Sequence, residues 1–249
     1  MQNTQIIILA AGKGTRMKSD EPKTMTLFRG KPFLEHILAT VDSLGLPIPP
    51  IIVVGHKKES IIKKFGEGRV YAEQPEMLGT GHAVSSAKAK AHKDHDTVLV
   101  LCGDQPLISA ETIKKILEQH EKKHPAITMA TLPLPDFEEW RKGLRHFGRI
   151  LRDTDGRIAG IVEYNEATEK EKLIKEINPS VYAFDADWLW KNIDLLRNDN
   201  VKGEYYLTDI IRIASGQGKP IESAALTDII EGLQPNTMEE VALMERITG

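Results

Sequence analysis

The chain has 249 residues, of which 41% are hydrophobic, so it can bury a sizeable core in one large α/β domain or two small ones. The formal net charge of −3 gives no global electrostatic argument for nucleic-acid binding, and the only cysteine, Cys102, rules out an intramolecular disulfide. No apolar run approaches the roughly 20 residues of a membrane span, and no signal peptide precedes the first predicted strand, so we expect a soluble cytoplasmic protein.

In the first half of the chain, short apolar runs alternate with helical patterns. The predicted strands are Ile6–Leu9, Ile51–Val54, Val98–Cys102 and Ile127–Leu132, and the predicted helices are Phe33–Leu44, Ser60–Phe65, Gly81–Ala91 and Ala110–His124. Ser109 is the expected N-cap of the last of these helices. This alternation predicts a doubly wound, mostly parallel sheet covered on both faces, with ligands beyond the carboxyl ends of its strands.

The second half has a different pattern. Gly148–Leu151 and Arg157–Glu163 are predicted strands joined by a turn at Asp153–Gly156, which is typical of a hairpin. A further strand is expected at Val181–Phe184, helices at Trp188–Arg197, Tyr205–Ser215 and Thr237–Ile247, and an exposed helix or loop at Glu166–Lys175. Because no linker marks a boundary, we expect one domain with a lobe inserted late.

The segment 9–23 reads L-A-A-G-K-G-T-R-M-K-S-D-E-P-K and follows the first predicted strand. A glycine-rich turn that leaves a strand presents backbone N–H groups, which bind phosphates. Arg16 and Lys23 add two cations, so the segment suits a nucleoside triphosphate. It is neither a P-loop, because Ile7 stands at the position of the first glycine, nor a dinucleotide fingerprint, because Met17 replaces the third.

Two later segments also follow predicted strands or precede helices. Asp104, directly after the strand Val98–Cys102, is well placed to hold Mg²⁺ against phosphates; a turn or helix cap is the alternative. The segment 74–83 reads Q-P-E-M-L-G-T-G-H-A and brings two glycines and the amide of Gln74 before a helix. An amide offers both a donor and an acceptor, which suits a base edge; a loop capped by Thr80 is the alternative.

His120, Glu121 and His124 fit the H-E-x-x-H pattern of zinc proteases. The two histidines share a helix face, but they continue an apolar stripe of that helix, and Pro125 ends the helix at once. No third ligand is evident downstream, so zinc hydrolysis is a distant alternative.

Residues 9–23 and 74–83 and the Gly-Asp element at 103–104 together resemble the sugar-1-phosphate nucleotidyltransferases. They are most similar to the uridylyltransferase domain of the bifunctional N-acetylglucosamine-1-phosphate uridylyltransferase/glucosamine-1-phosphate acetyltransferase. The resemblance extends from about Ile6 to Glu245. It includes F-G-R-I at 147–150, G-I-V-E at 160–163, E-I-N at 176–178, G-E-Y-Y-L-T-D at 203–209 and P-N-T at 235–237.

This resemblance implies a Rossmann-like fold of the nucleotide-diphospho-sugar transferase type in a single domain, 1–249. It has a nucleotide-binding part (about 1–135), a sugar-binding lobe (about 136–225), and a C-terminal metal-site segment and helix (226–249). The implied activity is Mg²⁺-dependent transfer of UMP from UTP to N-acetylglucosamine 1-phosphate, which gives UDP-N-acetylglucosamine, a cell-wall precursor, and pyrophosphate. The implied site residues are Arg16 and Lys23 (catalytic), Leu9, Ala10, Ala11, Gly12, Gly14, Gln74, Gly79 and Thr80 (nucleotide), Gly148, Glu163, Asn178, Tyr206 and Thr208 (sugar), and Asp104 and Asn236 (Mg²⁺).

The chain departs from the family pattern at several positions. Cys102 stands where tyrosine is frequent, Asn165 where lysine is usual, and Pro179-Ser180 where Thr-Gly is usual. The Gly-Val that usually precedes the metal-site asparagine is also absent before Asn236.

Other activities stay open. The same chemistry could use glucose 1-phosphate, dTTP or CTP; cytidylyltransferases share the opening motif but lack the run 203–209. A non-catalytic nucleotide-binding regulator is a more distant alternative. The bifunctional relatives carry a β-helix of hexapeptide repeats that acetylates and trimerises, and no repeat occurs in this sequence. We therefore expect one activity and a monomer or small homo-oligomer, without nucleic-acid or membrane partners.

Overall fold

The computed structural model describes residues 3–17 and 19–249. Ten strands form the main sheet in the order β5-β4-β1-β6-β11-β7-β10-β8-β9, with β12 pairing with β7 off this path, and β2 and β3 form a separate pair. The strands are β1 (Thr4–Leu9), β2 (Leu27–Phe28), β3 (Lys31–Pro32), β4 (Ile51–Val54), β5 (Val70–Glu73), β6 (Thr97–Cys102), β7 (Ile127–Pro133), β8 (Arg149–Arg152), β9 (Ile158–Val162), β10 (Glu176–Ile177), β11 (Tyr182–Asp185) and β12 (Ile221–Ala225).

The α-helices are α1 (Phe33–Asp42), α2 (Lys58–Phe65), α3 (Thr80–Ala87), α4 (Ala110–Lys123), α5 (Ala186–Asn192), α6 (Asp209–Gly216) and α7 (Met238–Thr248). Short 3₁₀ helices occur at Thr15–Met17, Lys23–Met25, Lys88–Lys90, Glu139–His146, Glu171–Leu173, Ile193–Leu195 and Ile229–Gly232. Among the described residues, no helix is both long enough and apolar enough to span a membrane.

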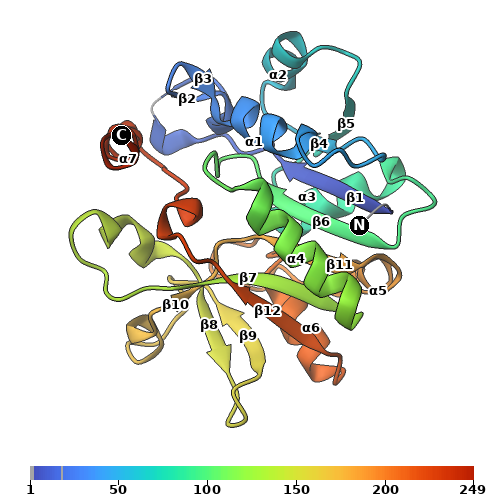
Figure 1. Cartoon of the computed structure of the whole chain (residues 1–249), viewed down its shortest axis with the longest axis vertical. Helices are drawn as coiled ribbons and strands as arrows, with labels where there is room; N and C mark the ends of the chain where they lie inside the picture. The colour runs from blue at the N-terminus through green and yellow to red at the C-terminus, as the bar shows by residue number, and fades with distance from the viewer. Residues whose placement is uncertain (1–2, 18) are drawn as a thin grey trace.

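Strand β1 is the centre of the core because it pairs in parallel with β4 on one side and β6 on the other. Ile7 packs into a cluster with residues of α3, α5 and α6. Ile6 and Ile8 point to the opposite face, where α1, α2 and α4 cover them. Both faces of the strand are buried, which explains its apolar run Ile6–Leu9. Helix α4 crosses in front of the sheet in Figure 1.

The predicted doubly wound, mostly parallel sheet is confirmed, with one strand reversed inside it. Strand β11 runs antiparallel between β6 and β7, with Tyr182 opposite both Val100 and Met129. Beyond β7 the sheet continues through β10 into the antiparallel pair β8 and β9, which forms the yellow hairpin at the bottom of Figure 1. Gly156 has a φ of +77° in the turn of this hairpin, so the predicted hairpin is also confirmed.

Helix α7 packs back onto the first part of the chain. Val241 and Met244 form a small buried cluster with Phe28, Phe33 and Met17, and in Figure 1 the red helix stands beside the blue β2 and β3. The packing of α7 carries the segment before it, including Asn236, towards the first loop.

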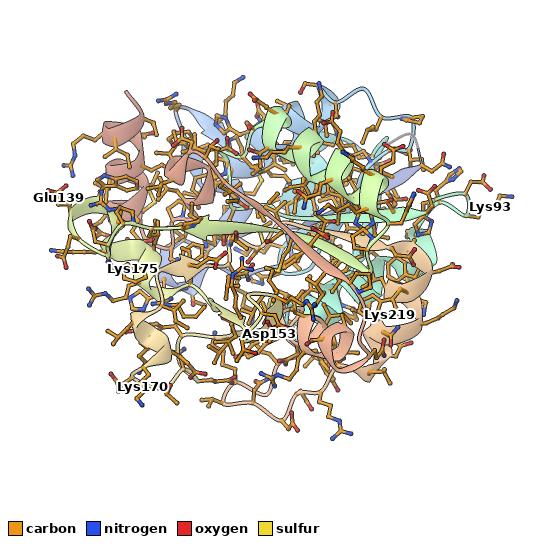
Figure 2. All side chains as sticks on the ribbon, turned by 60° about the horizontal axis from the view of Figure 1, so that its bottom comes forward. Lys93, Glu139, Asp153, Lys170, Lys175 and Lys219 are labelled. Carbon is orange, nitrogen blue, oxygen red and sulfur yellow. The ribbon has the colours of Figure 1, made fainter. Side chains whose placement is uncertain are left out.

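The charged side chains of Lys93, Glu139 and Lys170 lie at the edge of the molecule in Figure 2.

Some predicted elements differ from the structure. The helix predicted from Tyr205 begins only at Asp209, because the backbone of Tyr205 bonds instead to Leu78 and Gly81. The helix predicted to Ala91 ends at Ala87 and continues as a 3₁₀ turn, and the one predicted to Arg197 ends at Asn192. The sequence predicts no strand at β2, β3, β5, β10 or β12. Strand β12 lies in the central sheet although it falls within the range assigned to the lobe.

The N-cap of α4 is predicted to contribute measurably to stability. Ser109 Oγ accepts a bond from the Thr112 amide at 3.1 Å and donates to Glu231 Oε1 at 2.9 Å. Ser109→Ala should therefore lower the free energy of unfolding, measured in urea, by about 1–2 kcal/mol. Ser43→Ala is the control, because the Ser43 hydroxyl bonds only the carbonyl of Thr40 at an exposed helix end; equal losses in both variants would contradict the capping role.

Candidate active site

A cavity of about 460 Å³ lies beyond the carboxyl ends of the central parallel strands. Of the residues predicted to bind nucleotide, phosphate or metal, those that line it are Leu9, Ala11, Gly12, Gly14, Lys23, Gln74, Gly79, Thr80 and Asp104. Ala10 does not line it, because its side chain is fully buried and its amide donates to the Val53 carbonyl. The cavity therefore combines the glycine turn after β1 with the two later segments that the sequence suggested.

Lys23 stands at the centre of the polar contacts around this cavity. Its Nζ donates to Asp104 Oδ2 at 2.5 Å and to Asn236 Oδ1 at 2.8 Å. Arg16 Nη2 donates to the same Asn236 oxygen at 2.9 Å. Three segments that are far apart in the sequence thus meet at one ammonium group.

The turn after β1 puts Lys23 in this position. The Lys23 amide bonds to the Gly12 carbonyl, and Gly14 has a φ of +63°. A Cβ atom on Gly14 would lie 2.7 Å from the Cβ of Lys23, so only glycine allows the two chain segments to pack this closely. The glycines therefore serve the placement of the lysine as well as the exposure of backbone N–H groups.

The donor atoms around Lys23 fit a magnesium ion. Asp104 offers a carboxylate and Asn236 an amide oxygen, which are hard ligands of the kind that Mg²⁺ prefers, and the ammonium of Lys23 is a cation already bound by both. In the part of the chain that the structure describes, no group of three or more His, Cys, Asp or Glu residues could hold a metal. Asp104 and Asn236 would thus supply only part of a coordination shell, as is usual where substrate phosphates complete the coordination of Mg²⁺.

Gln74 is buried against the loop that follows it. Its Nε2 donates to the Gly79 carbonyl at 2.9 Å and lies 3.1 Å from Nδ1 of His82. Gly79 has a φ of +107°, and a Cβ atom there would lie 2.6 Å from the Tyr205 carbonyl oxygen. Thr80 Oγ1 accepts a bond from the Leu207 amide at 2.9 Å, so the loop 74–83 is fastened to the run 203–209.

The residues predicted to bind sugar form a second polar cluster. Thr208 Oγ1 donates to Glu163 Oε1 at 2.9 Å, and a Cβ atom on Gly148 would lie 3.6 Å from the same oxygen. The backbone N–H of Asn178 donates to the Gly148 carbonyl at 2.9 Å. Tyr206 is also buried, and this burial raises the pKa of its hydroxyl to about 12.

Two departures from the family pattern meet between these clusters. Cys102 lines the 460 Å³ cavity, and its Sγ lies 3.8 Å from the Ser180 carbonyl. Burial raises the pKa of the Cys102 thiol, so the side chain is an uncharged wall. Ser180 adopts a φ of +61°, which explains the family preference for glycine there, and its amide bonds to Asn178 Oδ1. Asn165, the third departure, is exposed.

Other residues of the site were not predicted. The cavity beyond the carboxyl ends of the central strands is also lined by Lys13, Thr15, Thr24, Met77, Ala83 and Glu204. Tyr182 donates from its hydroxyl to Asn178 Oδ1 at 2.9 Å. In the sequence Tyr182 is indistinguishable from a core residue of a strand, whereas Glu204 lies inside the run 203–209, and that position is the signal that could have identified it.

The H-E-x-x-H segment has a structural role. His120 is buried, its Nδ1 lies 3.0 Å from Thr128 Oγ1, and burial lowers its pKa to about 4. His124 is the left-handed C-cap of α4. Among the described residues this segment belongs to no cluster of metal ligands, so the zinc alternative has no support.

Comparison with known proteins gives matches over the whole chain. Residues 6–139 match the model of the MobA-like NTP transferase domain. The bifunctional protein GlmU of Bacillus licheniformis is 41% identical over 239 residues, which is 96% of this chain and 50% of that protein. GlmU of Heliobacterium modesticaldum is 39% identical over 99% of this chain and 52% of its own. The chain therefore spans about half the length of these curated relatives.

A solved structure shares the fold. The crystal structure of a UDP-glucose pyrophosphorylase complexed with UDP-glucose superposes with a TM-score of 0.78 at 17% sequence identity. The match covers 100% of this chain and 98% of that one, so the complete topology is shared.

The buried carboxyl of Glu163 predicts a pH-dependent stability difference. Burial raises the pKa of Glu163, so the folded state binds its proton more tightly than the unfolded state does. Stability is therefore lost as the pH rises from the unfolded pKa, about 4.3, through the raised folded pKa. In thermal unfolding, Glu163→Gln should have a higher Tm than the wild type at pH 8, and the difference should be smaller at pH 5. Exposed Glu118→Gln is the control; a gain equal at both pH values would disprove the assignment.

Proposed function

Because the chain belongs to the family of MobA-like NTP transferase domains, and is thus a nucleotidyltransferase, we propose that it transfers UMP from UTP to N-acetylglucosamine 1-phosphate. The products are UDP-N-acetylglucosamine and pyrophosphate. The relatives named bifunctional GlmU are matched over about half of their length, and the proposal is confined to the matched half.

The observation that carries the proposal is the convergence on Lys23. A cation, a carboxylate and an amide oxygen from three separate segments meet at a cavity that also contains Gln74. Cationic and metal-binding groups beside a base-reading amide suit a nucleoside triphosphate better than an uncharged ligand. The proposed nucleotide site is completed by Leu9, Ala11, Gly12, Gly14, Gly79 and Thr80. Ala10 lies behind this lining, where its backbone N–H donates to the Val53 carbonyl.

The proposed reaction needs no covalent intermediate. An oxygen of the sugar 1-phosphate forms a bond to the α-phosphorus of UTP while the bond from that phosphorus to the β-phosphate oxygen breaks. Pyrophosphate leaves with the electron pair. Lys23 and Arg16 stabilise the negative charge that develops on the phosphates, and rate enhancement comes from positioning and charge neutralisation.

Asp104 and Asn236 would hold the Mg²⁺ ion that the family implies. When bound, the ion supplies neutralisation of phosphate charge and aligns the phosphates of both substrates. In this structure Asp104 Oδ2 and Asn236 Oδ1 both bind the ammonium group of Lys23, which supports their assignment as ligands of a cation.

Glu163, Thr208, Asn178, Gly148 and Tyr206 are proposed to hold the sugar. The carboxylate of Glu163 is an acceptor for sugar hydroxyls and amides, and Thr208 fixes one of its oxygens. Asn178 Oδ1 is held by the Ser180 amide and the Tyr182 hydroxyl. The Asn178 side-chain nitrogen donates one hydrogen to Ser180 Oγ at 3.4 Å, and its second hydrogen is proposed to bond a carbonyl oxygen such as that of the N-acetyl group.

Substrate choice is tested by pyrophosphate release from UTP, dTTP, CTP and GTP, each paired with N-acetylglucosamine, glucosamine and glucose 1-phosphates. UTP with N-acetylglucosamine 1-phosphate should give the highest kcat/KM. Asn178→Ala should lower the preference for N-acetylglucosamine over glucose 1-phosphate, by up to about tenfold, because one hydrogen bond to the acetyl carbonyl is lost.

Tyr182→Phe provides the matched comparison for that variant. It removes only the hydroxyl that orients Asn178, so the sugar preference should shift in the same direction by a smaller factor. A wild-type enzyme that uses both sugars equally would refute the assigned N-acetyl contact.

Asp104→Asn tests the magnesium assignment. The substitution keeps the size of the side chain and removes its charge, so kcat at millimolar Mg²⁺ should fall about 10²-fold or more, with partial recovery at higher Mg²⁺. Asp42→Asn is the control, because Asp42 pairs with Arg69 on the surface. Near-normal turnover of Asp104→Asn at low Mg²⁺ would be incompatible with a metal ligand at this position.

A further inference from the structure

The orientation of the Gln74 amide is fixed by its neighbours. A backbone carbonyl only accepts hydrogen bonds, so the atom 2.9 Å from the Gly79 oxygen must be the amide nitrogen. The same nitrogen lies 3.1 Å from His82 Nδ1, which must then be an acceptor. His82 therefore carries its proton on Nε2, and both hydrogens of the Gln74 amide are used.

The other end of the amide is left for a ligand. Gln74 Oε1 has no hydrogen-bond partner among the described residues, yet it is not one of the polar atoms sealed from solvent without a partner. Gln74 lines the nucleotide cavity, whereas His82 lines a separate cavity of about 330 Å³ together with Leu78 and Ser85. His82 thus holds Gln74 from the side away from the nucleotide cavity.

The oxygen Oε1 of Gln74 decides which pyrimidine base can bind. Uracil carries a hydrogen on N3 and donates there, whereas the N3 of cytosine is an acceptor. Oε1 accepts from uracil N3–H and repels the lone pair of cytosine N3; the inverted amide would favour cytosine. Thymine presents the same N3–H as uracil, so this contact does not separate UTP from dTTP.

We infer that His82 is the positioning residue that makes this site select uracil over cytosine, by holding Gln74 with its acceptor oxygen towards the base. The inference rests on the proposed uridylyl transfer and adds the means by which the base is chosen. His82 does not contact the nucleotide in this arrangement, so its effect passes through Gln74.

The imidazole is itself held in place. His82 lies in the first turns of α3, where its carbonyl accepts a bond from Ser86 Oγ at 2.8 Å. The Tyr205 ring packs beside it, with the ring centroids 6.4 Å apart. Tyr205 is in turn bonded through its backbone to Leu78 and Gly81 on either side of the loop. The Ser86 bond anchors the backbone of this turn, the Tyr205 ring flanks the imidazole, and the contact with Gln74 sets the direction of Nδ1.

The test compares UTP and CTP in His82→Ala. With pyrophosphate release from UTP and N-acetylglucosamine 1-phosphate as the assay, kcat/KM for UTP is measured together with the inhibition constant of CTP. Loss of one orienting hydrogen bond should reduce the preference for UTP over CTP about fivefold, through weaker use of UTP and unchanged or tighter binding of CTP. His82→Asn, whose side-chain oxygen can accept from Gln74, should restore most of the preference.

Two further variants show whether the effect passes through Gln74. In a Gln74→Ala background, His82→Ala should change the UTP to CTP preference no further. Ser85→Ala, which alters the same cavity without touching Gln74, should leave the preference unchanged. The inference would be overturned if His82→Ala weakened UTP use and CTP binding by the same factor. It would also be overturned if His82→Ala changed the UTP to CTP preference as much in the Gln74→Ala background as in the wild type.

Failure of the proposed function gives a different result. A wild-type protein that binds UTP in calorimetry but releases no pyrophosphate contradicts uridylyl transfer, and the ratio of the UTP and CTP dissociation constants in His82→Ala then tests the inference alone. A wild-type protein that binds neither nucleotide overturns both.

Discussion

The site depends on one ammonium group, that of Lys23, to which two distant parts of the chain bind at once. Lys23 reaches Asp104, which follows β6, and Asn236, which precedes α7. Asp104 is in place because β6 pairs with β1 over its whole length, and Asn236 because α7 packs against Phe28 and Phe33. A lysine that is partly withdrawn from water needs such anionic and polar partners, so the fold of the sheet, the first turn and the last helix are all constrained by the same charge.

A second set of contacts joins the cavity around Lys23 and Gln74 to the polar cluster of Glu163, Asn178 and Thr208, the proposed nucleotide and sugar sites. The loop 74–83 bonds to the run 203–209 through Tyr205 and Leu207, and Cys102 contacts the carbonyl of Ser180 beside Asn178. Strand β11, which leads out of this segment, runs antiparallel between β6 and β7. The reversed strand therefore brings Asn178 and Ser180 next to the carboxyl end of β6, which Asp104 follows.

The features that the sequence predicted are those decided by local pattern. Strands β1, β4 and β6 were found because burial on both faces demands uninterrupted apolar runs, and Ser109 because N-caps need a side-chain acceptor. The glycine turn after β1 was found because its composition limits what it can be. The resemblance added Asn236, which on its own sequence is an ordinary residue before a helix.

The remaining features depend on contacts between distant residues. The start of α6 is set by bonds from Tyr205 to a loop more than a hundred positions earlier, and β12 has a half-polar sequence that becomes a strand by pairing with β7. The pairing of Gln74 with His82 lies within one quoted motif, yet only the structure shows which atom of each side chain faces the other. Propensity and periodicity carry no such information.

The close approach of Gly79 and Gly81 to Tyr205 has a consequence for engineering this scaffold. The loop 74–83 and the run 203–209 are more than a hundred positions apart in the sequence. Neither glycine leaves room for a side chain, and the Thr80 hydroxyl accepts a hydrogen bond from the Leu207 backbone N–H. A loop transplanted from another transferase in place of 74–83 would lack these matched contacts with the run 203–209 and would not keep its shape. The loop and the run 203–209 form one discontinuous module, and recombination of such enzymes must exchange the two pieces together.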